Sequence, residues 1–74
     1  MNNQYAVILV YATSYALRVE KILQARQVNS KLIPVPRHLS SDCGVCVRID
    51  RANKEIAVQA LVATQVETEG IHDI

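Results

Sequence analysis

The chain has 74 residues and a mass of 8.2 kDa, which is room for one domain, residues 1–74. Half of the residues are hydrophobic and one fifth are charged, with two each of Gly, Pro and Cys, which excludes a disordered tail, a collagen-like repeat and a disulfide-rich scaffold. The longest apolar run has eight residues, whereas a membrane-spanning helix needs about 20. The first residues form no basic leader, so we expect a cytoplasmic protein that does not contact membranes.

The net charge of +1 is unevenly distributed. Residues 1–54 hold all eight Lys and Arg against three acidic residues, and residues 55–74 hold four acidic residues and no base. The chain has no Phe or Trp, so it lacks the aromatic platforms that proteins use to stack nucleic-acid bases. We therefore expect a solvated charged surface and no nucleic-acid partner.

The first half of the chain predicts a strand, a helix and a second strand. Residues 5–11 are apolar on both alternating faces, which is typical of a central strand. Thr13 or Ser14 can cap the helix that follows, which we expect to end near residues 28–30. Its apolar stripe is Tyr15, Ala16, Val19, Ile22 and Leu23. Residues 31–36 hold both prolines, so they favour a short strand at the edge of a sheet.

The second half repeats this order after a loop at residues 38–42. Residues 44–49 alternate in polarity as a strand does, and Asp50 can cap a second helix. The stripe of this second helix is Asn53, Ile56, Ala57, Ala60, Leu61 and Thr64. Residues 66–69 are the predicted last strand. The order βαββαβ predicts an α+β ferredoxin-like sandwich, a four-stranded antiparallel sheet with two helices on one face.

The alternation within residues 44–49 also predicts which side chains face the helices. If Val45, Val47 and Ile49 face them, Cys46 and Arg48 lie on the opposite, open face of the sheet. A shift of one residue in strand register would reverse this assignment.

Cys43 and Cys46 form a Cys-x-x-Cys pair, which serves dithiol redox chemistry, half of a zinc site, or neither. Three residues of extended strand span roughly 10 Å, whereas a disulfide needs Cα atoms about 4.4–6.8 Å apart. An intramolecular disulfide therefore requires a turn at Gly44 and Val45. If Gly44 instead opens the strand, Cys43 lies at the tip of the loop and the two thiols act separately.

Polar groups near Cys43 can make its sulfur reactive, because thiolates are stabilised by cations, backbone N–H groups and hydroxyls. Cys43 lies in a polar loop and is expected to be reachable from water, whereas Cys46 fits a buried packing role equally well. Asp42 opposes a thiolate by its charge. The groups expected to converge on Cys43 are Arg37, Ser40, Ser41, the Gly44 N–H and Arg48.

A zinc site is the alternative use of the two cysteines. Together with His38 and His72 they would complete a tetrahedral Cys2His2 set. The two histidines have no ligand spacing, so we expect no metal and no cofactor.

Residues 34–44, with the sequence PVPRHLSSDCG, and the following Cys46-Val47-Arg48 resemble the signature of the Se/S carrier protein-like family, a small bacterial family formerly of unknown function. The specific part is the run Pro-Arg-x-x-Ser-Ser-x-Cys-Gly. The resemblance extends over nearly the whole chain, including the strand at residues 5–11, the helix at residues 14–27 and the closing residues 66–71.

The resemblance implies that Cys43 carries sulfur or selenium as a persulfide or selenopersulfide, with Cys46 as a candidate resolving thiol. It implies a carrier rather than an enzyme, with a cysteine desulfurase or other sulfur- or selenium-relay proteins as partners. Two alternatives remain: a ferredoxin-like interaction module whose open sheet face pairs with a second copy or another protein, and a Cys-x-x-Cys redox or zinc site.

Overall fold

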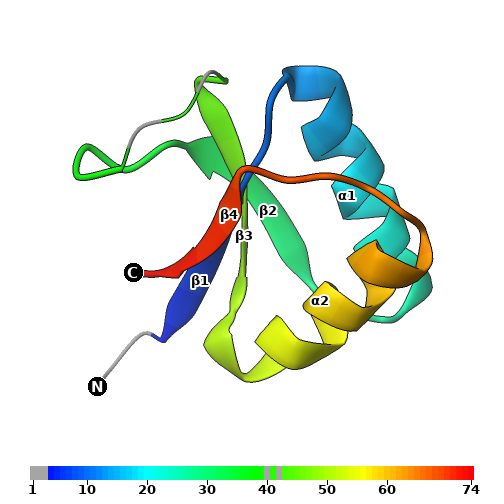
Figure 1. The fold of residues 1–74 in the computed structure, drawn as a ribbon. Coiled ribbons are helices and arrows are strands. Elements are labelled where there is room, and N and C mark those ends of the chain that lie inside the picture. Colours follow the sequence, from blue (N-terminus) through cyan, green and yellow to red (C-terminus); the bar gives the residue numbers. More distant parts are fainter. Residues whose placement is uncertain (1–3, 40, 42) are drawn as a thin grey trace.

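The computed structural model describes residues 4–39, 41 and 43–74. Its sheet is antiparallel in the order β2-β3-β1-β4, and both helices cover one face (Figure 1). This confirms the predicted α+β ferredoxin-like fold. The elements in chain order are β1 (Tyr5–Leu9), α1 (Thr13–Ala25), β2 (Ser30–Pro34), β3 (Val45–Asp50), the short 3-10 helix η1 (Arg51–Asn53), α2 (Lys54–Ala63) and β4 (Gly70–Asp73).

The two helices are crossover connections between strands that are not neighbours. The α1 helix joins β1 to β2 with β3 lying between them, and α2 joins β3 to β4 with β1 lying between them. The two central strands are therefore β1 and β3. The predicted edge position of the proline-containing strand is confirmed, because β2 lies at one end of the strand order, although the strand ends at Pro34 and does not include Pro36 as predicted.

The main hydrophobic core lies between the sheet and the helices. The strands supply alternate side chains to it, because successive residues of a strand point to opposite faces. Helices supply residues spaced three and four apart. Its buried members are Ala6, Ile8, Val10, Ala16, Val19, Leu23, Val28, Cys43, Val47, Ile49, Ala57 and Leu61. The predicted orientation of Val45, Val47 and Ile49 toward the helices is confirmed, with Val45 partly buried at the edge of this core.

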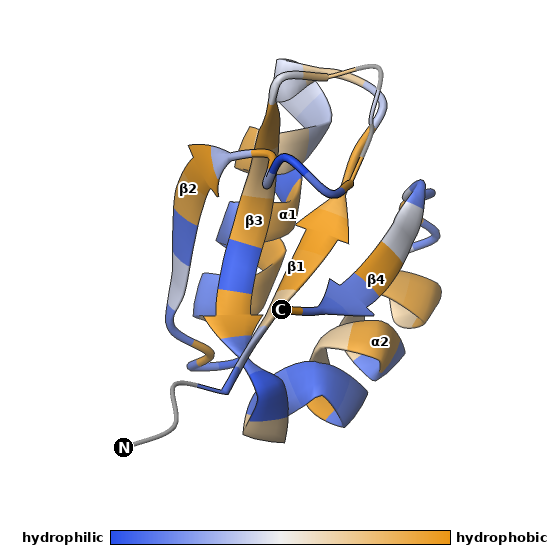
Figure 2. Ribbon diagram, turned by 90° about the vertical axis from the view of Figure 1, so that its left-hand side faces the viewer, coloured by the Kyte–Doolittle hydropathy of each residue, from blue (hydrophilic) through white to orange (hydrophobic). Residues whose placement is uncertain are grey.

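A second, smaller cluster lies on the outer face of the sheet, the face turned away from the helices. Its buried side chains are Val7, Leu9 and Cys46. Partly buried Ile33, Val35, Leu39 and Ile74 pack against them. Figure 2 looks onto this face, where β1 is hydrophobic along its length. Residues of the loop after β2 therefore cover part of the face that the sequence predicts to be open.

The helix starts differ from the prediction. The N-cap of α1 is Ala12, with no side-chain cap hydrogen bond, so neither Thr13 nor Ser14 serves as the cap. Asp50 precedes η1 instead of α2, again without a side-chain cap. The apolar stripes predicted for the two helices also include residues that are not buried: Tyr15 is 39% and Ile56 is 44% exposed.

Both helices end in the same way. Gln27 and Gln65 adopt positive φ angles of 61° and 58°, and the next residue, a valine in each case, donates its N–H to a leucine carbonyl of the last helical turn. This arrangement is the Schellman motif. It explains why residues 66–69 do not form the last strand as predicted: the N–H of Val66 closes α2, and β4 begins only at Gly70.

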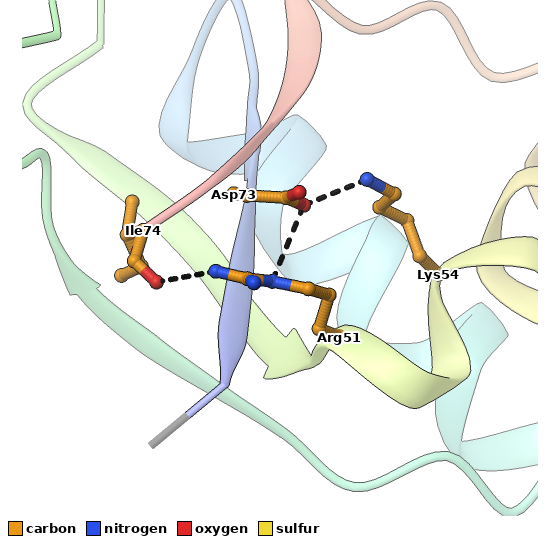
Figure 3. Close-up of polar contacts among 4 residues, drawn as sticks. All are labelled: Arg51, Lys54, Asp73 and Ile74. Atoms are coloured by element: carbon orange, nitrogen blue, oxygen red, sulfur yellow. Dashed lines mark hydrogen bonds and ion pairs between the residues drawn. The ribbon is translucent and has the colours of Figure 1, made fainter. Parts of the chain in front are cut away.

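A group of charged side chains holds the end of β4 (Figure 3). The Asp73 carboxylate accepts a hydrogen bond from Lys54 Nζ at 2.7 Å and lies 3.6 Å from Arg51 Nε. Arg51 Nη2 also donates to the backbone carbonyl of Ile74 at 2.9 Å. Because β4 is an edge strand that pairs only with β1, these contacts tie it to the start of α2.

We predict that this contact makes stability depend on acid pH. The hydrogen bond from Lys54 lowers the pKa of Asp73 below its ordinary 3.8, so the contribution of the carboxylate is fully present above that value. It is lost as the pH falls through the lower folded-state pKa. The difference in unfolding midpoint between the wild type and Asp73→Asn, measured by urea denaturation, should be present at pH 7 and shrink toward zero in strong acid.

Glu67→Gln is the matched control, because the side chain of the exposed Glu67 makes no hydrogen bond or ion pair with the residues that the structure describes. The effect of this control substitution on the urea unfolding midpoint should not shrink in strong acid as that of Asp73→Asn does. An equal effect of Asp73→Asn at neutral and strongly acid pH would contradict the assigned contact.

Candidate functional site

Cys43 lies at the junction between the loop that follows β2 and the start of β3. Its side chain is buried, with 6% of its surface exposed, and packs into the core beneath the helices. The expectation that this thiol is reachable from water at a loop tip is therefore wrong for the folded state. The sulfur lies 3.6 Å from the hydroxyl oxygen of Thr13, the first residue of α1.

Ser41 connects the loop to the sheet. Its hydroxyl oxygen lies 3.0 Å from the carbonyl of Val10 and contacts the carboxylate of Glu69. The same oxygen accepts the backbone N–H of Cys43 at 3.2 Å. Ser41 thus joins the segment carrying the thiol to the end of β1 and to the residue before β4. Ser40, also a predicted site residue, and Asp42 lie outside the described residues.

The two predicted arginines do not contact Cys43. Arg48 lies five residues further along, roughly 17 Å in an extended strand, and its guanidinium stacks over the ring of Tyr5 at 4.2 Å. Arg37 is exposed and makes no hydrogen bond or ion pair with the residues that the structure describes. Among the described residues, the polar groups that contact Cys43 are the Thr13 hydroxyl and, through the Cys43 N–H, the Ser41 hydroxyl oxygen.

Cys46 lies in the outer cluster and is fully buried. Its sulfur is 3.9 Å from the carbonyl oxygen of Pro34. Burial raises the pKa of this thiol, and the nearby charge of Cys43 raises it further. Both cysteines are free, and they pack on opposite faces of the sheet, so this arrangement does not hold them as a disulfide.

Gly44 contributes to the site through its backbone. Its carbonyl accepts the N–H of Val35 at 3.1 Å, which extends the pairing of β2 and β3 by one step toward the loop. A Cβ atom added at Gly44 would meet nothing within 4 Å. Among the described glycines only Gly70 has a positive φ, so Gly44 is not required for an unusual backbone conformation.

Within the described part of the chain, no three His, Cys, Asp or Glu side chains gather closely enough to hold a metal ion. The zinc alternative needs both cysteines at one point, whereas they pack in separate clusters. No helix among these residues has the length and apolar character needed to cross a membrane.

Sequence analysis did not identify Thr13 and Glu69 as parts of the site. The local sequence predicts Thr13 as a helix cap and Glu69 as part of a strand. They lie 30 residues from Cys43 and 28 residues from Ser41, respectively, so no local motif joins them. The fold order is the only signal that could have done so, since it brings the end of β1 together with the starts of β3 and β4.

The fold and site define a small ferredoxin-like domain with two buried free thiols, of which Cys43 lies beside the first turn of a helix. Residues 5–73 match the model of the family described as "Putative Se/S carrier protein-like", and the chain belongs to this family. No curated protein and no solved structure was found to match it significantly.

We predict that the two thiols differ in reactivity in the native protein. Cys46 is fully buried and has a raised pKa, so it should remain unmodified by iodoacetamide at neutral pH until the protein unfolds. Cys43, at the edge of the core, should be modified first. Peptide mass spectrometry on samples taken over time measures this order, and earlier modification of Cys46 would contradict the arrangement described.

Proposed function

We propose that this protein carries sulfur or selenium on Cys43, as a persulfide or selenopersulfide, between relay enzymes. Membership of the Se/S carrier protein-like family supports carriage in general. The observation that supports Cys43 in particular is the position of its sulfur beside Thr13, at the N-terminal end of the 13-residue helix α1.

The surroundings of Cys43 suit a charged sulfur that must be kept from side reactions. The N-terminal end of a helix carries partial positive charge and favours anions. The Thr13 hydroxyl can donate to an anionic sulfur. The surrounding core excludes water and soluble oxidants, to which a reactive sulfur is otherwise exposed.

The transfer step is a sulfur exchange without net oxidation. The Cys43 thiolate attacks the outer sulfur of a persulfide on the donor enzyme, forming a new S–S bond. The S–S bond of the donor breaks, and the donor leaves as a thiolate. The acceptor enzyme takes the outer sulfur from Cys43 by the same exchange. Cysteine desulfurases and other relay proteins are the class of donor that fits.

Exchange requires the donor to reach a sulfur that is 6% exposed, so we propose that the loop opens during transfer. Ser41 is the polar link that holds the loop to Val10 and Glu69. Opening exchanges these hydrogen bonds for bonds to water, at roughly 0.5–3 kcal/mol for each bond, and takes Cys43 out of its apolar surroundings. A docked partner can offset that cost.

Cys46 is the candidate resolving thiol in the same proposal, but only after the loop has moved. Its sulfur packs on the outer face, whereas Cys43 packs on the helix side. A disulfide between them needs a turn at Gly44 and Val45 and the loss of their pairing with β2.

The first test of the proposal is persulfide loading. The protein is incubated with a cysteine desulfurase and cysteine, and intact mass spectrometry should show a gain of roughly 32 Da, one sulfur atom. Cys43→Ser, whose hydroxyl can keep the contact with Thr13, should show no gain. Cys46→Ala is the control and should still load. A gain retained in Cys43→Ser, or none in the wild type, would overturn the proposal.

The second test is access to the thiol. In a Cys46→Ala background, Ser41→Ala removes the links to Val10 and Glu69, so iodoacetamide should modify Cys43 several-fold faster at the same pH. Gly44→Ala is the matched control, since its Cβ has free space, and should leave the rate nearly unchanged. Equal rates for the Ser41 variant and its background would show that Ser41 does not control access.

A further inference from the structure

A pocket of about 310 Å³ lies at the end of β3 remote from Cys43, where β3 meets β1 and the start of β2. Its lining includes Tyr5, Asn29, Lys31, Arg48 and Asp50. Its volume is at the lower end of the range for small-molecule sites. Neither the fold nor the carrier function uses this pocket.

Two cations face each other in this pocket. Lys31 on β2 and Arg48 on β3 are direct register partners. Like charges directly opposite on neighbouring strands repel each other and destabilise the pair. Neither cation makes an ion pair with a carboxylate in the described part of the chain. A bound anion is the simplest group that would relieve this repulsion.

The guanidinium of Arg48 is held in place before any ligand arrives. It stacks over the ring of Tyr5 at 4.2 Å, a cation–π contact that fixes its plane. A planar, fixed guanidinium can present two parallel N–H donors to a carboxylate. Less conformational freedom is then lost on binding than for a freely moving side chain.

Asp50 determines what else the ligand must carry. It also lines the pocket, on the strand that carries Arg48, and its carboxylate reduces the local charge to one net positive. A multiply charged anion is disfavoured beside it. A ligand with one carboxylate and a neighbouring cationic donor can pair its carboxylate with Lys31 and Arg48 and its cationic donor with Asp50.

We propose that this pocket binds a small amino acid, with its carboxylate between Lys31 and Arg48 and its ammonium group toward Asp50. The proposal is independent of whether Cys43 carries sulfur, since the two sites lie at opposite ends of β3.

The test is a titration of the ¹⁵N-labelled full chain followed by NMR, with L-alanine, acetate and inorganic phosphate as probes. L-alanine should produce saturable shifts confined to the amides of residues 29–31 and 48–50, and acetate should bind several-fold more weakly. Shifts that do not saturate, or phosphate binding tighter than alanine, would overturn the assignment.

Variants separate the three contacts. Arg48→Gln and Lys31→Gln should each weaken alanine binding by about tenfold. Arg48→Lys should restore alanine binding only partly, because the ammonium group of lysine cannot form the two parallel hydrogen bonds of a guanidinium. Asp50→Asn should weaken alanine but strengthen acetate. Arg18→Gln is the control, because Arg18 is a surface residue outside the pocket. If Arg18→Gln weakened alanine binding as much as Arg48→Gln, the proposal would be contradicted. The amide spectrum of each variant also reports whether it is folded.

Discussion

The two-residue period of β3 is the constraint on which the rest of the arrangement depends. Because successive side chains of a strand point to opposite faces, Cys46 packs in the outer cluster, whereas Cys43, which precedes β3, packs in the helix-side core. The same period turns Arg48 to the outer face, away from the thiol. The two cysteines therefore lie on opposite faces of one sheet, and Arg48 shares the face of Cys46.

Patterns within one element could be predicted from the sequence, and contacts between elements could not. The order of strands and helices and the orientation of Val47 and Cys46 follow from local periodicity. The burial of Cys43 does not, because it depends on where α1 lies over the sheet. The start of β4 was misplaced because the local sequence of residues 66–69 resembles a strand, whereas the N–H of Val66 completes the end of α2.

A carrier thiol must satisfy two opposing requirements, and the loop before β3 offers a physical means of meeting both. Shelter comes from the apolar neighbours of Cys43, which form part of the permanent core. In the proposed carrier function, release requires the polar contacts of Ser41 to exchange with water and the Cys43 side chain to leave its apolar neighbours.

The matching helix ends have a consequence for how this chain can vary. Each half, a strand, a crossover helix and a second strand, closes its helix with the same glutamine–valine pair, Gln27-Val28 and Gln65-Val66. The segment at residues 35–44 joins the two halves. It packs Val35 and Leu39 on the outer face of the sheet and Cys43 in the helix-side core, so a change in its length would disturb both hydrophobic clusters at once, whereas the two helix ends would stay intact.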